Sequence, residues 1–111
     1  MHQSNVFAIA VEVVITENGA ASADVLTANG EILDVDRMLF LRSYLEQLQR
    51  VISEDVPVKG YFLWSLMDNY EWSDGYAMRF GITYVDYKTM KRTVKLSGQF
   101  YKEVIARNGL A

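Results

Sequence analysis

The spacing of hydrophobic residues predicts three elements in the first two thirds of the chain. Residues 6–16 read VFAIAVEVVIT, a β-branched and mostly apolar run that predicts a strand centred on 11–16. Apolar residues then recur at helical spacing to about residue 53, which predicts a long amphipathic helix that Asp34 or Asp36 caps at its start. Residues 60–67 read GYFLWSLM, an apolar run without a helical stripe, and predict a short strand buried on both faces.

The last third of the chain predicts a shorter strand and a second helix. Residues 80–87 (FGITYVDY) alternate enough to form a short strand or extended segment, and 88–92 form a polar turn. An amphipathic helix follows over about 96–107, and we expect it to bury its apolar side chains, Phe100, Tyr101, Val104 and Ile105. The Asn108-Gly109 pair is suited to a left-handed cap at the end of this helix.

The order of these elements places the chain in the α/β class. Strand, helix and strand joined by a long connection imply a parallel pair with a right-handed crossover. Residues 1–111 form one domain at most. Two parallel strands with two covering helices do not close a sheet, so the unit is expected to be incomplete.

Composition narrows the possible chemistry. The 111 residues carry a net charge of -3 and show no Lys/Arg cluster, which argues against nucleic-acid binding. There is no cysteine, and His2 is the single histidine, so disulfide scaffolds, thiolate metal sites and histidine triads are excluded. Acid-base chemistry therefore falls to carboxylates, Lys or Tyr.

The apolar run near the start of the chain does not have the features of a targeting segment. Residues 6–15 are interrupted by Glu12, lack a basic lead-in and have no small-residue cleavage site. No run approaches the ~20 apolar residues that span a bilayer. We expect a soluble, cytoplasmic protein without a membrane partner.

Glu17 is the first candidate for chemistry, because it lies at the carboxyl end of a predicted strand. In parallel α/β folds that end of the sheet is the functional edge. The alternative is that Asn18-Gly19 forms a hairpin turn, in which case Glu17 would be a surface turn residue.

The second candidate is Glu71, which Tyr70 and Trp72 flank just past the second predicted strand. Aromatic faces beside a carboxylate suit a sugar site, although an aromatic-rich core strand is the alternative. Two carboxylates at the ends of neighbouring strands suggest glycoside chemistry. Asp68 and Asp74 lie in turn-like contexts and are expected to cap loops.

Three blocks of the sequence resemble glycoside hydrolase family 1, the retaining β-glucosidases and β-galactosidases. Residues 15–21 (ITENGAA) look like the family's nucleophile motif. Residues 60–87 (GYFLWSLMDNYEWSDGYAMRFGITYVDY) resemble its C-terminal signature, and 91–109 (KRTVKLSGQFYKEVIARNG) its last helix. The resemblance implies a partial (β/α)8 TIM barrel, in which this chain is similar to the C-terminal portion, the seventh and eighth of eight strand-helix units.

The same resemblance implies a role for each candidate residue. Glu17 would be the nucleophile that forms a covalent glycosyl-enzyme. Because retaining hydrolysis needs only carboxylates and water, the resemblance implies no metal or organic cofactor. Trp64 would stack under the bound sugar, and Phe80 would line the same pocket. Glu71 and Trp72 would bind sugar hydroxyls, which replaces the role of Glu71 as half of a catalytic pair.

The chain also departs from the family pattern. The family's acid/base lies in an Asn-Glu-Pro motif, which is absent here, and Val94 stands where a Pro often precedes the last helix. We therefore expect negligible turnover from this polypeptide alone. The implied substrate is a β-glycoside or glucose-like sugar, and the implied protein partner is a complementing barrel segment or further copies of the chain. The alternatives are a catalytically inactive sugar-binding remnant and a self-assembling half-barrel.

Overall fold

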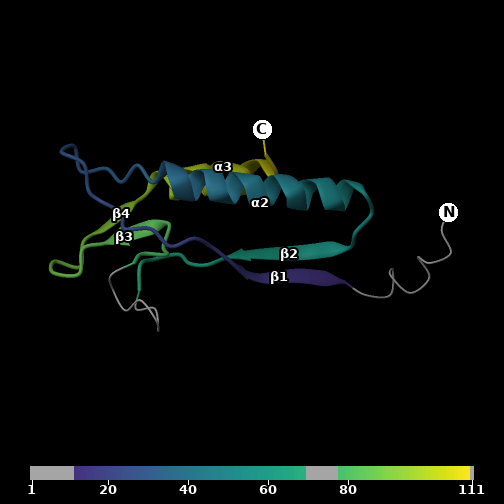
Figure 1. The fold of residues 1–111 in the computed structure, drawn as a ribbon, viewed down its shortest axis with the longest axis horizontal. Coiled ribbons are helices and arrows are strands. Elements are labelled where there is room, and N and C mark those ends of the chain that lie inside the picture. Colours follow the sequence, from purple (N-terminus) through teal and green to yellow (C-terminus); the bar gives the residue numbers. More distant parts are fainter. Residues whose placement is uncertain (1–11, 70–77, 111) are drawn as a thin grey trace.

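The computed structural model describes residues 12–69 and 78–110, which form two layers (Figure 1). The elements in chain order are β1 (Val13–Asn18), α2 (Val35–Ser53), β2 (Val58–Leu63), β3 (Thr83–Val85), β4 (Arg92–Val94) and α3 (Leu96–Arg107). Helices α2 and α3 lie on one side of the β1–β2 pair, and the short β3–β4 pair lies at one end of the molecule. Residues 6–11 of the predicted first strand lie outside the described residues.

Strands β1 and β2 pair in parallel, as the sequence predicts. Val13 aligns with Val58, and the ladder ends where the Trp64 N–H donates to the Asn18 carbonyl at 2.9 Å. The intervening residues include α2, which supplies the long connection that a parallel pair requires. The interpretation of Asn18-Gly19 as a hairpin turn is therefore wrong.

The helices cover only one face of this sheet. Leu41 and Leu45 of α2 and Val104 of α3 are buried between the layers. On the opposite face Val14 and Phe62 are 46% and 61% exposed. The prediction that the second strand is buried on both faces is wrong for the described residues, because no described element covers this second face. We refer to the surface around Val14 and Phe62 as the open face.

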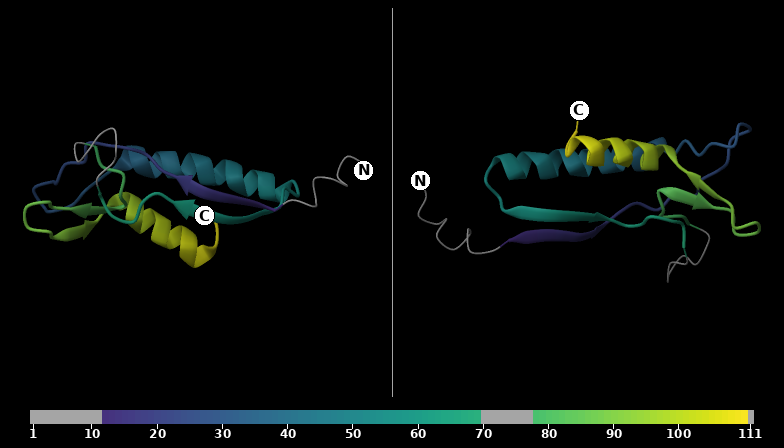
Figure 2. Two further views of the ribbon diagram at one scale, coloured as in Figure 1. Left: turned by 90° about the horizontal axis from the view of Figure 1, so that it is seen from below. Right: turned by 180° about the vertical axis from the view of Figure 1, so that it is seen from behind.

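Strands β3 and β4 form an antiparallel hairpin at one end of the molecule. Figure 2 shows this arrangement from two further sides. Asp86 closes its turn, because Oδ1 accepts from the backbone N–H groups of Lys88 and Thr89 at 2.9 and 3.2 Å. These backbone hydrogen bonds lower the pKa of the Asp86 carboxyl. The polar turn is confirmed, but the polar three-residue strand β4 that follows it was not predicted.

Both helices occupy the predicted ranges, although the cap at the start of α2 differs from expectation. Asn108 ends α3 in the left-handed conformation, with φ 55° and ψ 40°, as the Asn-Gly pair predicts. Asp34 precedes α2, yet its carboxylate makes no capping bond and contacts Arg37 instead. Ile105, which was expected to be buried, is 64% exposed, because α3 packs mainly against α2.

None of the helices among the described residues is long and apolar enough to cross a membrane.

Candidate active site

A pocket of about 370 Å³ lies at the carboxyl end of the parallel strands. Its walls come from the end of β1, the middle of α2, the residue after β2 and the segment before β3. The lining residues are Glu17, Asn18, Gly19, Phe40, Tyr44, Trp64 and Phe80. Three of the sequence-predicted site residues, Glu17, Trp64 and Phe80, are therefore brought together.

Backbone contacts at the end of β1 fix Glu17 beside the tryptophan segment. The Asn18 carbonyl accepts from the Trp64 N–H, and a Cβ added at Gly19 would lie 1.9 Å from the Trp64 carbonyl oxygen. Only glycine permits that approach. The carboxylate of Glu17 is exposed to solvent, so a ligand in the pocket can reach it.

A tyrosine on the helix side of β2 supports the same corner. Tyr61 Oη donates to Asn18 Oδ1 at 2.8 Å, which orients the residue that follows Glu17. Burial, with a smaller contribution from Tyr101, raises the pKa of Tyr61 to about 12. The phenol therefore stays a donor at neutral pH.

The aromatic side of the pocket is held by two backbone hydrogen bonds. Ser65 N–H donates to the Phe80 carbonyl at 3.2 Å, and Ile82 N–H donates to the Ser65 carbonyl at 2.9 Å. Trp64, which precedes a cis peptide bond, remains 39% exposed beside Glu17. A carboxylate in this position can attack an electrophilic carbon of a ligand. The face of the accessible indole beside it can pack against an apolar surface of the same ligand.

Behind this pocket lies a group of buried charges that the sequence did not predict. It contains three carboxylates and three cations, and we call it the buried ion cluster. Its members are Asp24, Asp34, Arg37, Asp68, Arg79 and Lys95. One sign of it was present in the sequence: Arg37 precedes Leu41 and Leu45 at four-residue spacing, so it shares the buried face of α2.

Asp68 combines this role with the loop-capping role that the sequence predicts. Its carboxylate accepts from the backbone N–H groups of Gly81 and Val85 at 3.1 and 3.2 Å, which confirms the prediction. It also pairs with Lys95 Nζ at 2.7 Å and Arg79 Nη1 at 2.6 Å.

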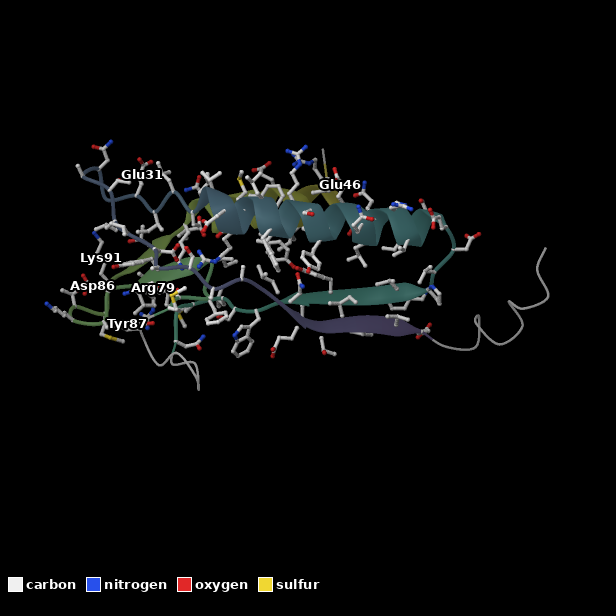
Figure 3. The ribbon with its side chains drawn as sticks, viewed as in Figure 1. Glu31, Glu46, Arg79, Asp86, Tyr87 and Lys91 are labelled. Carbon is white, nitrogen blue, oxygen red and sulfur yellow. The ribbon has the colours of Figure 1, made fainter. Side chains whose placement is uncertain are left out.

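Arg79 lies between Asp68 and two tyrosine rings. Its guanidinium carbon is 4.1 Å from the ring centre of Tyr84 and 4.6 Å from that of Tyr87. Figure 3 labels Arg79 and Tyr87, which lie at the end of the molecule formed by β3 and β4. Burial alone would lower the pKa of Arg79, but the hydrogen bond and the charge of Asp68 raise it overall.

Comparison with known proteins places this arrangement in a family. The family model described as glycosyl hydrolase family 1 matches residues 5–110. The chain belongs to glycosyl hydrolase family 1.

Relatives of this family 1 chain are known by sequence and by structure. It is 56% identical over 99 residues to the 1,4-beta-D-glucan glucohydrolase of Thermotoga neapolitana, with 89% of this chain and 22% of the relative covered. It is 54% identical over 99 residues to Beta-glucosidase A of Thermotoga maritima, again covering 89% and 22%. The chain thus spans about a fifth of the length of these relatives.

A solved structure agrees closely with the fold. The beta-glucosidase from Thermotoga maritima in complex with deoxynojirimycin matches with a TM-score of 0.88 and 53% identity, covering 90% of this chain and 23% of that chain. Such neighbours are (β/α)8 barrels, and the family 1 chain is a partial version of that fold, with one parallel strand pair among its described residues.

The remaining candidates lie outside the described residues. Glu71, Trp72 and Asp74 belong to the range 70–77, so the structure does not place them. Among the described residues, no group of three His, Cys, Asp or Glu side chains could hold a metal ion.

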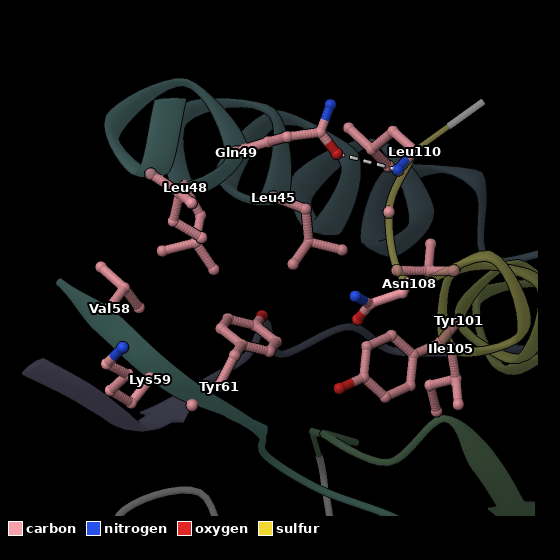
Figure 4. Close-up of a pocket in the computed structure, with 14 residues that line it drawn as sticks. Leu45, Leu48, Gln49, Val58, Lys59, Tyr61, Tyr101, Ile105, Asn108 and Leu110 are labelled. Atoms are coloured by element: carbon pink, nitrogen blue, oxygen red, sulfur yellow. Dashed lines mark hydrogen bonds between the residues drawn. The ribbon is translucent and has the colours of Figure 1, made fainter. Parts of the chain in front are cut away.

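A larger cavity of about 520 Å³ lies elsewhere in this family 1 chain, between the helix layer and β2 (Figure 4). Leu45 and Leu48 of α2, Tyr61 of β2 and Tyr101 and Ile105 of α3 line much of it. Neither Glu17 nor another carboxylate lines it, so we regard it as loose packing between the layers and keep the smaller pocket as the candidate site.

Proposed function

We propose that this chain supplies the nucleophile and part of the sugar-binding surface of a retaining, β-glucosidase-like glycosidase. In this proposal the chain corresponds to the seventh and eighth strand-helix units, the C-terminal portion of the barrel. The observation that carries the proposal is that Glu17, at the carboxyl end of a parallel strand, shares one pocket with Trp64 and Phe80. This edge of a barrel sheet is where the catalytic residues of such folds lie.

Each residue has a defined role in the proposed reaction. The carboxylate of Glu17 attacks the anomeric carbon and the glycosidic bond to the leaving oxygen breaks, which gives a glycosyl-enzyme that water then hydrolyses. Trp64 stacks on the sugar ring and Phe80 lines the same pocket. Glu71 and Trp72 bind hydroxyls of the sugar in the innermost subsite.

The proposed substrate is a β-glucoside. Two of the relatives named above carry a glucosidase or glucan glucohydrolase activity in their names. No Asn-Glu-Pro tripeptide is present in the sequence to protonate the leaving oxygen, a step that contributes about 10²–10⁴-fold in rate. The proposed activity therefore depends on a residue that this chain does not provide.

We propose that this residue comes from a complementing barrel segment that covers the open face. Val14 and Phe62 expose apolar side chains there, beside a parallel strand pair with two unpaired edges in the described part of the chain. Unpaired strand edges and exposed apolar patches of this kind mark surfaces on which another element packs. Self-association of the chain would cover the same surfaces without an acid/base, and it is the alternative candidate.

The test is a graft in which residues 5–110 replace the matching segment of Beta-glucosidase A from Thermotoga maritima. We expect the graft to hydrolyse an aryl β-glucoside, and Glu17→Gln to abolish turnover. Glu46→Gln, on the exposed side of α2, is the matched control and should retain activity. The chain alone should show less than about a thousandth of the rate of the graft, given the missing acid and the missing positioning.

Mass spectrometry separates a nucleophile from a binding carboxylate. An activated 2-deoxy-2-fluoroglucoside, whose glycosyl-enzyme hydrolyses slowly, should add one sugar to the peptide that contains Glu17. A label on a different peptide of the graft, or full activity in Glu17→Gln, would refute the assignment.

A further inference from the structure

Arg37 connects two of the segments that line the Glu17 pocket. Its Nε donates to the Ala20 carbonyl at 3.1 Å, and its Nη2 donates to the Arg79 carbonyl at 2.7 Å. Ala20 lies three residues after Glu17, and Arg79 directly precedes Phe80. A single guanidinium, 1% exposed, therefore bonds to the main chain next to both pocket residues.

A backbone bridge joins the same two segments. Ser22 N–H donates to the Arg79 carbonyl and Arg79 N–H donates to the Ser22 carbonyl, both at 2.8 Å. The Arg79 carbonyl thus accepts from Ser22 and from Arg37 together. The bridge sets the spacing of the segments, and the guanidinium fixes the bridge to α2.

The buried ion cluster holds the guanidinium in this orientation. Arg37 Nη1 pairs with Asp24 at 2.9 Å and with Asp34. Asp24 also accepts from Lys95 Nζ at 2.6 Å, and Lys95 reaches Asp68, the partner of Arg79. This series of ion pairs therefore ends at Arg79, the residue that precedes Phe80.

Charge balance explains why the cluster can be buried without supplying much stability. Three carboxylates face three cations, so no charge is left uncompensated. Buried ion pairs can often be replaced by apolar groups of similar volume with little loss of stability, whereas their directional bonds specify one geometry. Reaction rates depend on that geometry, and a misplacement of ~1 Å by a remote substitution can reduce the rate about 10²-fold.

We propose that Arg37 is a positioning residue, which the buried ion cluster orients so that it holds the Glu17 and Phe80 segments in register. This inference rests on the proposed function of Glu17. It extends that function to a side chain that does not line the pocket.

The test uses the graft described above with three variants. Arg37→Lys keeps the charge but loses the fork that reaches two carbonyls. Arg37→Met with Asp34→Asn removes a cation together with the carboxylate that, among the described residues, is paired with this cation alone. Asp24 then keeps Lys95, and Asp68 keeps Lys95 and Arg79, so the remaining charges stay paired. Arg50→Met is the matched control, because Arg50 lies on the same helix with 66% of its side chain exposed.

We expect kcat/KM of Arg37→Lys to fall about 10- to 100-fold, mainly through kcat, while Arg50→Met is unchanged. The charge-balanced double variant should melt near the temperature of the unsubstituted graft yet remain as impaired as Arg37→Lys. If activity instead returns together with thermal stability in the double variant, the role is structural only. Unchanged kcat in Arg37→Lys would overturn the proposal as well.

A spectroscopic measurement keeps the inference separate from the proposed function. In protein labelled with 5-fluorotryptophan, the Trp64 resonance is assigned by its loss in Trp64→Phe. We expect Arg37→Lys to displace this ¹⁹F resonance and Arg50→Met to leave it in place. An inactive graft with Arg37 intact would refute the proposed function of Glu17. The positioning role of Arg37 would then be tested by the ¹⁹F spectrum alone. A Trp64 resonance that does not move in Arg37→Lys would overturn that role.

Discussion

Replacing Lys95 by methionine tests whether the buried ion cluster depends on each of its cations. Lys95 is fully buried, and its Nζ donates to Asp24 at 2.6 Å and to Asp68 at 2.7 Å. Methionine fills much of the volume of the lysine stem but provides no charge. The variant therefore leaves three carboxylates with two cations.

The expected loss follows from these contacts. Removing one partner of a buried ion pair costs about 3–5 kcal/mol, because the remaining charge is uncompensated. Asp24 retains Arg37 and Asp68 retains Arg79, so we expect the lower end, about 3 kcal/mol. A domain of this size has about 5–15 kcal/mol in total, so the loss is a large fraction of its stability.

Urea unfolding of the 111-residue chain, followed by far-ultraviolet circular dichroism, measures this loss. With a slope of about 1–3 kcal/mol per molar urea, the midpoint should fall by roughly 1–3 M. Lys102→Met, an exposed position on α3, should change stability by no more than about 0.5 kcal/mol. Lys95→Met with Asp24→Asn leaves Arg37 paired with Asp34 and Arg79 paired with Asp68, so it should recover at least half of the loss. A cost below about 1 kcal/mol for Lys95→Met would refute the reasoning.

Three further predictions concern packing, pH and helix capping. A Cβ at Gly98 would lie 2.7 Å from the Ile82 carbonyl oxygen, so Gly98→Ala should lower thermal stability by about 2 kcal/mol; Gly60→Ala, whose nearest contact would be 3.5 Å, should change it by less than about 0.5 kcal/mol. Because burial raises the pKa of Tyr61 to about 12, its contribution to stability is fully present below pH 10 and is lost as the pH rises through 12. Since this side chain is only half buried, urea titrations should show a loss of about 1 kcal/mol over that range, and a weaker pH dependence in Tyr61→Phe. Asn108 has a positive φ of 55°, so Asn108→Gly should stabilise the chain by about 0.5 kcal/mol and Asn108→Val should destabilise it, as measured by thermal melting.

The sequence predicted the helices well because helical periodicity is a local pattern, and it predicted the parallel pair because a long helical connection between two strands favours parallel pairing. Helix α3 occupies the predicted range because its amphipathic run ends at the Asn108-Gly109 pair. The second strand, predicted over 60–67, lies at Val58–Leu63, since a uniform apolar run gives little information about its ends. Strand β4 has three residues and is defined by its pairing with β3, which no local pattern reports.

The sequence predicted the part of the site that consists of motif residues near strand ends. It did not predict the ion pairs between residues that are far apart in the chain. Glu17, Trp64 and Phe80 line one pocket, while Glu71 and Trp72 remain predictions. The buried ion cluster joins residues up to 71 positions apart, and such pairings cannot be found from one sequence. The second strand was predicted to be buried on both faces for a related reason. An apolar composition indicates that a face packs against something, but it does not show whether the covering layer belongs to the described residues.

The self-contained balance of the buried ion cluster has a consequence for how such barrels can be assembled. All three of its carboxylates meet cations that belong to the described part of this chain. These six charges therefore need no partner from another segment. If this segment replaces its counterpart in a related barrel, the six charges stay paired, and the fit of the apolar open face against the new neighbours then limits which chimaeras fold.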